Sequence, residues 1–78
     1  MRRLGKVMHL SKSGNLIVKL ERNNPPPVGA EVFDPKLEKV GTVNNVLGPV
    51  SAPYLSLTPT ERTDERAVGK TVYLAEKK

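Results

Sequence analysis

The sequence predicts an all-β domain, a small closed barrel of six strands, and three observations lead to this prediction. Val, Leu, Ile and Thr recur in short runs broken by Gly and Pro, which is typical of strands and turns. No stretch of ten or more residues has the i, i+3, i+4, i+7 spacing of an amphipathic helix. The 78 residues include no Cys, so we expect one domain over 1–78, without disulfides and with a charged end at 76–78.

The chain begins with a predicted hairpin. We expect strands at 4–10 and 15–21, joined by a short polar turn in which Gly14 is free to take a positive φ. The second strand places three apolar residues on one face: Leu16, Val18 and Leu20. The triple proline that follows cannot donate ladder hydrogen bonds, so 23–27 is expected as an extended spacer outside the sheet.

Four further strands are predicted at 30–33, 39–47, 54–58 and 71–75. An Asp-Pro-Lys turn at 34–36 connects the first two of them. The segment 58–61 has the pattern of a helix N-cap, but 60–67 has almost no apolar residue to anchor a helix. We therefore expect a solvated loop there, with at most one helical turn.

An internal repeat supports closure of the sheet. Residues 28–33 and 68–73 share the pattern V-G-x-x-V-aromatic, forty positions apart. Each copy has a turn glycine that leads into a short strand, as expected when two strands join a closed sheet in related ways. This favours a barrel with Phe33 and Tyr73 in its core, and the alternative is a chance similarity in a Val-rich chain.

Nothing in the sequence predicts catalysis. The single histidine, His9, has no activated nucleophile beside it in the sequence, and the acids at 61, 64 and 65 alternate with arginines in what we take to be a solvated loop. We expect no catalytic residue, metal, cofactor or small-molecule ligand. The N-terminus lacks the apolar segment of a signal peptide and no run is long enough for a membrane span, which favours an intracellular protein.

The net charge of +5 points towards RNA, but its distribution weakens that interpretation. Four of the five excess charges lie at the two ends of the chain, on Arg2, Arg3, Lys77 and Lys78. If the first and last strands pair, these residues form a non-specific, salt-sensitive RNA contact, and the alternative is that they only make the domain soluble. A stacking platform for bases is missing if Phe33 and Tyr73 belong to the core.

The most unusual segment is the loop at 48–53, in which two prolines and a glycine hold apolar residues rigid between two strands. A loop that only connects strands is normally polar. Rigid presentation of apolar residues lowers the entropy cost of docking, so Val50, Ala52 and Tyr54 are candidates for a protein-binding surface. The alternative, equally open at this point, is that Val50 and Tyr54 plug one end of the barrel.

The same region carries a family motif. The pattern V-G-x-V-x-x-V-x-G-P-V-x-x-P-Y over 40–54 resembles the Gar/Naf family of H/ACA ribonucleoproteins, as do the segments 3–7, 68–69 and 72–73. Arg-Gly-rich tails are absent, which points to the minimal archaeal form, cytoplasmic in a cell without a nucleus. The resemblance implies a translation-factor-like barrel that serves as a non-catalytic subunit of an RNA-guided pseudouridine synthase acting on rRNA.

The resemblance also implies partners and a surface. The direct partner is the catalytic subunit of the synthase, and guide RNA and the other particle proteins are indirect partners. Binding holds a substrate-clamping loop of the synthase open, which helps RNA to load and product to leave. The implied partner surface consists of Gly48, Pro49, Val50, Pro53 and Tyr54, with Val43 and Val46 as further candidates, one of which can be core. The competing function is a barrel that binds RNA directly as a ribosome-assembly accessory protein.

Overall fold

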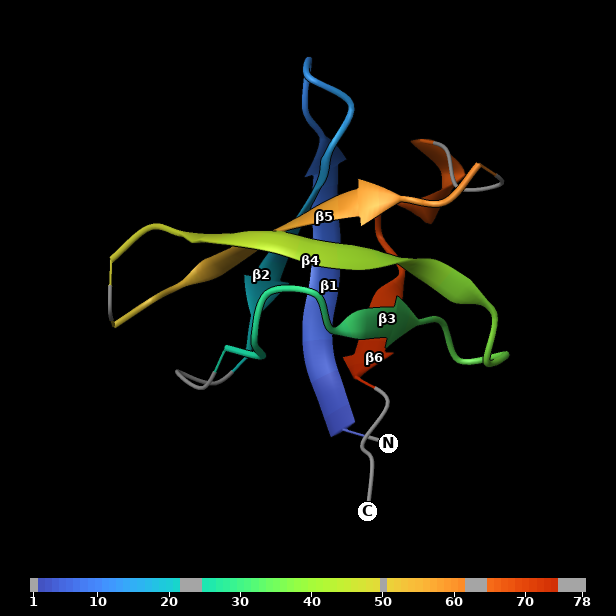
Figure 1. Ribbon diagram of the computed structural model, residues 1–78, viewed down its shortest axis with the longest axis horizontal. Coiled ribbons are helices and arrows are strands. Elements are labelled where there is room, and N and C mark those ends of the chain that lie inside the picture. Colours follow the sequence, from blue (N-terminus) through green and yellow to red (C-terminus); the bar gives the residue numbers. More distant parts are fainter. Residues whose placement is uncertain (1, 22–24, 50, 62–64, 75–78) are drawn as a thin grey trace.

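The computed structural model describes residues 2–21, 25–49, 51–61 and 65–74. Six strands follow one another along the chain: β1 (Arg2–Leu10), β2 (Leu16–Leu20), β3 (Glu31–Phe33), β4 (Lys39–Leu47), β5 (Tyr54–Pro59) and β6 (Thr71–Leu74). They are arranged in the order β1-β2-β5-β4-β3-β6 and close into a barrel in which every pair is antiparallel (Figure 1). The predicted all-β, six-stranded barrel is confirmed.

The strands agree with the sequence prediction to within two residues at each described boundary. In the described part of the segment after β5 there is one 3-10 turn, η1 (Glu65–Ala67), in line with the expected limit of one turn. The triple proline lies outside the strands as predicted, although Pro26 is buried and the carbonyl of Pro27 accepts a hydrogen bond from the amide of Ala30 (3.2 Å). Among the described residues, no helix has the length and apolar character to cross a membrane.

The core is one aliphatic cluster inside the barrel. In β2 the three alternate residues predicted to share a face are all buried, whereas Lys19 between two of them is exposed. Side chains therefore fill the interior, as in other small barrels. Eight residues are less than 2% exposed: Val7, Leu16, Val18, Val32, Val43, Leu55, Leu57 and Val72.

Two glycines allow the backbones of β1 and β4 to approach the neighbouring strands, β2 and β5, very closely. A Cβ on Gly41 would lie 2.5 Å from the Thr58 carbonyl oxygen of β5, and a Cβ on Gly5 would overlap the Lys19 carbonyl oxygen of β2. Each glycine is followed by a bulge, between Val7 and His9 in β1 and between residues 43 and 45 in β4. Bulges bend and twist strands, so these two positions let the long strands curve around the core.

The internal repeat marks two structurally related strand starts. Gly29 and Gly69 both adopt left-handed conformations, with φ of 95° and 91°. The amide of Gly29 donates to the carbonyl of Val43 (2.8 Å), and the amide of Gly69 donates to the carbonyl of Val7 (2.8 Å). In both copies the residue that accepts this bond, Val43 or Val7, also donates its own amide to the carbonyl of the residue after the glycine. The repeat is therefore structural, and β6-β1-β2 is built like β3-β4-β5.

The aromatic residues at the end of each repeat are not in the core, which corrects the sequence prediction. Phe33 and Tyr73 face each other in the β3–β6 pair, and both are half-buried. Each directly follows a valine that is 0% exposed, Val32 or Val72. Because successive side chains in a strand point to opposite faces, both aromatic rings lie on the outer face of the barrel.

Candidate partner-binding surface

The β4–β5 hairpin projects well beyond the barrel, to the left in Figure 1. Leu47, the last residue of β4, pairs with Tyr54, the first residue of β5. The amide of Ala52 donates to the carbonyl of Pro49 (3.1 Å) and so closes a four-residue turn at the end. Gly48 enters this turn with a φ of 85°, a conformation that side chains other than glycine rarely adopt.

The end of this hairpin is apolar and carries no charge. Residues 40–60 contain no Lys, Arg, Asp or Glu. Val46 and Leu47 are 37% and 38% exposed. The turn residues 48, 49, 51 and 52 are exposed as well, whereas Pro53 is buried. We call this surface the hairpin tip and define it by six residues: Val46, Leu47, Gly48, Pro49, Ala52 and Tyr54.

The hairpin tip is stiffened by its own packing. The Tyr54 ring lies next to the backbone of Gly48. A Cβ built on Gly48 would be only 3.3 Å from Tyr54 Cδ1. Pro49 fixes one backbone torsion in the turn, and Pro53 fixes another where β5 begins. A preformed apolar surface loses little conformational entropy on binding, which suits it to docking against a partner.

The structure places four of the predicted surface residues at the hairpin tip: Val46, Gly48, Pro49 and Tyr54. Val46 pairs with the inward Leu55, so its side chain lies on the opposite face of the hairpin from Tyr54. Val43 is only 1% exposed and belongs to the core, which corrects its inclusion in the surface. It points inwards because it pairs with Leu57, an inward residue of β5. Val50 lies outside the described residues.

Pro53 and Tyr54 differ in role. Pro53 is buried, and its carbonyl accepts a hydrogen bond from the amide of Leu20 (3.4 Å), so it anchors the hairpin to β2. Tyr54 does not plug the barrel, because it pairs with the exposed Lys19 on the outer face while its neighbour Leu55 points inwards. Of the two alternatives for Tyr54, its position supports a surface residue and not a plug of the barrel.

Leu47 and Ala52 complete the surface. Ala52 is a candidate from the sequence as well, whereas Leu47 is not among the predicted residues. Leu47 falls at a variable position of the motif, and the alternation in 39–47 leaves neither face of that strand wholly polar. The signal that would have found Leu47 is its place directly before Gly48, where the strand leaves the barrel. Motif positions identify the residues that shape the turn more readily than those that only cover it.

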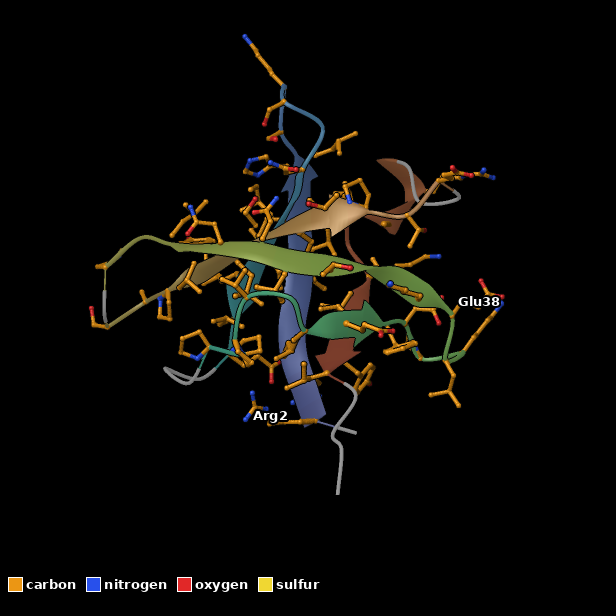
Figure 2. The ribbon with its side chains drawn as sticks, in the orientation of Figure 1. Arg2 and Glu38 are labelled. Atoms are coloured by element: carbon orange, nitrogen blue, oxygen red, sulfur yellow. The ribbon has the colours of Figure 1, made fainter. Side chains whose placement is uncertain are left out.

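The basic residues of the N-terminus lie at a different place. Arg2 and Arg3 belong to β1 and pair with Leu74 and Tyr73 of β6, so the start of β1 and the end of β6 are adjacent. Arg3 Nε donates to Glu21 Oε1 (2.9 Å), with both side chains largely in solvent. Figure 2 shows Arg2 at this end, away from Glu38 in the β3–β4 turn. Lys77 and Lys78 lie outside the described residues.

A hollow of about 670 Å³ opens beside the turn that carries Glu38. Its apolar floor includes Val40 and Val72. Its charged lining combines three acids with three bases, a mixture that favours neither anions nor cations: Asp34, Glu38, Glu61, Lys39, Arg66 and Lys70. Among the described residues, no group of three or more His, Asp or Glu side chains is placed to hold a metal ion.

A small barrel with a rigid, uncharged, apolar projection has a surface suited to contact with another macromolecule. Comparison with known proteins identifies the family of the chain. The chain belongs to the Gar1/Naf1 family, since the profile described as the Gar1/Naf1 RNA binding region matches residues 1–78. A protein of Methanothermobacter thermautotrophicus, described as uncharacterized, is 32% identical over 78 residues that cover 95% of this chain and 83% of that protein.

The family resemblance inferred from the motif is thus confirmed. Membership in the Gar1/Naf1 family associates the chain with RNA and with ribonucleoprotein particles. It also points to an accessory role and away from an enzyme.

Proposed function

We propose that this chain is a non-catalytic subunit of an H/ACA RNA-guided pseudouridine synthase particle, and that its hairpin tip binds the catalytic subunit. The observation that carries the proposal is the exposed, uncharged apolar surface at the end of the β4–β5 hairpin, in a member of the Gar1/Naf1 family. The particle belongs to the cytoplasm of an archaeal cell in this proposal, and rRNA is its substrate.

The energetics of the hairpin tip support a protein partner. Complete burial of a Leu, Val or Tyr side chain stabilises a complex by about 1.5–3 kcal/mol, and most binding energy comes from a few such residues. Leu47 and Tyr54 face each other across the two strands and form a continuous apolar pair. No charged group within 40–60 has to lose its hydration when this surface is covered.

In this proposal the subunit acts on conformational equilibria and supplies no reacting group. By binding the open position of a substrate-clamping loop of the synthase more tightly than the closed one, it raises the population of the open state. Opening of such loops often limits loading of substrate or release of product. The expected effect is therefore a faster turnover, with little change in the chemical step.

The double variant Pro49→Ala, Tyr54→Ala tests the proposal in the reconstituted particle. It should keep the circular dichroism spectrum of the barrel, lose co-elution with the catalytic subunit, and leave multiple-turnover pseudouridylation as slow as in a particle without this subunit. The matched control is Lys12→Ala, Ser13→Ala in the turn of the β1–β2 hairpin, which should bind normally. Retained co-elution of a folded double variant would rule out the hairpin tip as the contact.

A further inference from the structure

The positive charge of the protein is concentrated in the β1–β2 hairpin. Residues 2–21 contain five Lys and Arg but one acid, Glu21, so this quarter of the chain carries +4 of the total +5. Arg2 and Arg3 are part of β1, so they are not a detached tail. Charge gathered on two adjacent strands creates a stronger local potential than the same charge scattered over the surface.

Two lysines in this hairpin face each other directly. Lys6 of β1 pairs with Lys19 of β2, and both are exposed on the outer face of the barrel. Like charges at directly opposed positions destabilise an antiparallel pair. Within the part of the chain that the structure describes, neither ammonium group has an ion-pair partner, since Glu21 is held by Arg3 at 2.9 Å. The arrangement is that of a site for an external anion.

The outer aromatic pair lies on the same face of the sheet. Tyr73 is opposite Arg3 and opposite Phe33, while Thr71, two residues earlier in β6, is opposite Lys6. Tyr73 and Lys6 therefore occupy diagonal positions of the β1–β6 pair, a separation that aromatic and long side chains can span. Two acids of the same four strands and their ends are already paired with bases, Glu21 with Arg3 (2.9 Å) and Glu31 with Lys39 (3.9 Å).

We propose that this outer face of β3-β6-β1-β2 binds single-stranded RNA, with bases stacked on Tyr73 and Phe33 and phosphates held by Lys6 and Lys19. Proteins that bind single strands combine aromatic rings with a cationic track in this way. The ring faces accept any base, and the two ammonium groups act as point charges for the backbone. The site is therefore one for RNA with little sequence preference.

The aromatic pair is what favours RNA over an acidic protein surface. Lysines alone serve either partner, but two adjacent rings beside them on the outer face of the barrel match unstacked bases. The site borders the hairpin tip at one position, because Lys19 of β2 pairs with Tyr54 of β5. Its aromatic pair lies on β3 and β6, outside the β4–β5 hairpin, and the proposal does not rest on the contact with the synthase. Loss of stacking at Tyr73 should leave that contact intact, and loss of that contact should leave stacking at Tyr73 intact.

Fluorescence anisotropy with a short labelled oligouridylate tests the site on the full chain. Tyr73→Leu should weaken binding by about 5- to 150-fold, the loss of one stacked base, whereas Tyr73→Phe should retain it. Lys6→Gln, Lys19→Gln should make the dependence of log K on log salt shallower by about 1.4, since each phosphate contact to a single strand contributes about 0.7. The matched charge control is Lys12→Gln, Lys36→Gln, at two exposed turn positions. This variant should retain most of the RNA affinity, and adding Tyr73→Leu to it should still weaken binding by the same factor.

A second measurement reports stacking without removing the ring. The chain has two tyrosines and no tryptophan, so Tyr73 is the sole fluorophore in a Tyr54→Phe variant, and oligouridylate should quench it. An unchanged Tyr73 signal on saturation, or equal affinity for oligouridylate and for an RNA duplex, would overturn the proposal. Polyglutamate that binds as tightly as oligouridylate would do the same and would indicate an acidic protein partner. Equal losses in the charge control and in the Lys6, Lys19 variant would also contradict it.

Discussion

The β1–β2 and β4–β5 hairpins are built alike and yet present opposite surfaces. In each, a glycine presses against the neighbouring strand, a bulge follows, and a repeat glycine bonds to the bulged strand. The β1–β2 hairpin carries +4 and ends in the turn Ser-Lys-Ser-Gly, whereas the β4–β5 hairpin has no charge after Lys39 and ends in Gly-Pro-Val-Ser-Ala-Pro. One backbone plan therefore supports two different kinds of contact.

The difference teaches that the inner residues and the glycines specify the barrel, while the outer residues are free to specialise. Inward positions in both hairpins are aliphatic and buried, as Val7 and Val43 illustrate. Outward positions differ: the residue after the glycine is Lys6 opposite Lys19 in one hairpin and Thr42 opposite Thr58 in the other, and Leu47 lies opposite Tyr54 beyond the second bulge. The following four comparisons test how far the two hairpins share a backbone structure and how far their outer surfaces differ.

The largest effect on stability is expected at the two pressed glycines. Gly5→Ala and Gly41→Ala each put a Cβ against a backbone carbonyl, which overpacks the barrel wall and should cost about 1–3 kcal/mol of unfolding free energy. The loss should be greater at Gly5, where the approach is closer. Urea unfolding would measure both. If either variant is as stable as the parent, the two hairpins do not share this constraint.

A contrast in binding is expected between two equally exposed leucines. Leu47 is 38% exposed at the hairpin tip, and Leu10 is 39% exposed near the end of β1. Leu47→Ser should weaken binding to the synthase catalytic subunit by about tenfold or more, the effect of losing an apolar contact of about 1.5–3 kcal/mol, and Leu10→Ser should leave it unchanged. Isothermal titration of both variants gives the comparison. Equal losses would show that exposed apolar area, and not the hairpin tip, drives the association.

A smaller and matched effect is expected at the repeat glycines. A Cβ on Gly29 or Gly69 meets nothing within 4 Å, so substitution strains only the positive φ. Gly29→Ala and Gly69→Ala should therefore each lower the free energy of unfolding by about 1 kcal/mol, and by the same amount within error. Thermal unfolding of the two variants checks this. If the two variants lose unfolding free energies that differ several-fold, the two halves of the barrel are not structurally alike at these glycines.

The smallest effect is expected at the Arg3–Glu21 ion pair. Its side chains are 60% and 44% exposed, and exposed pairs contribute about 0.2–1 kcal/mol. A double-mutant cycle with Arg3→Gln and Glu21→Gln should give a coupling energy in that range that disappears in concentrated salt. A coupling energy that survives salt would mean that the pair helps to hold β1 in the barrel, a role without a counterpart in the β4–β5 hairpin.

Much of the fold follows from local sequence signals. The turn glycines, the prolines and the alternation in β2 define strands and loops, and the repeat indicates closure. The faces of the shorter strands do not follow, because the side on which Phe33 and Tyr73 lie depends on pairing between strands that are forty residues apart. Large aromatic residues also usually favour a core, and here the narrow interior is filled by Val and Leu.

The same limit applies to the candidate sites. The motif identifies the residues that shape the hairpin tip, because Gly and Pro act through the local backbone. It does not separate Val43 from Val46, since the bulge between 43 and 45 interrupts the alternation of β4. The Lys6–Lys19 pair is likewise invisible in sequence, because the register of β1 against β2 decides which residues of a hairpin oppose each other.

The claim that the hairpin tip binds the synthase and the outer face binds RNA is tested most directly by measuring both kinds of binding with both kinds of variant. The hairpin-tip variant Pro49→Ala, Tyr54→Ala and the outer-face variant Tyr73→Leu are each titrated with the synthase catalytic subunit and with oligouridylate. Tyr73 is chosen because it pairs with Arg3 and Phe33, whereas Lys19 pairs with Tyr54 of the hairpin tip. The tip variant should lose the synthase and keep the RNA, and the outer-face variant should keep the synthase and lose RNA affinity. If one of the folded variants loses both partners, or if neither loses any, the two hairpins do not carry separate contacts.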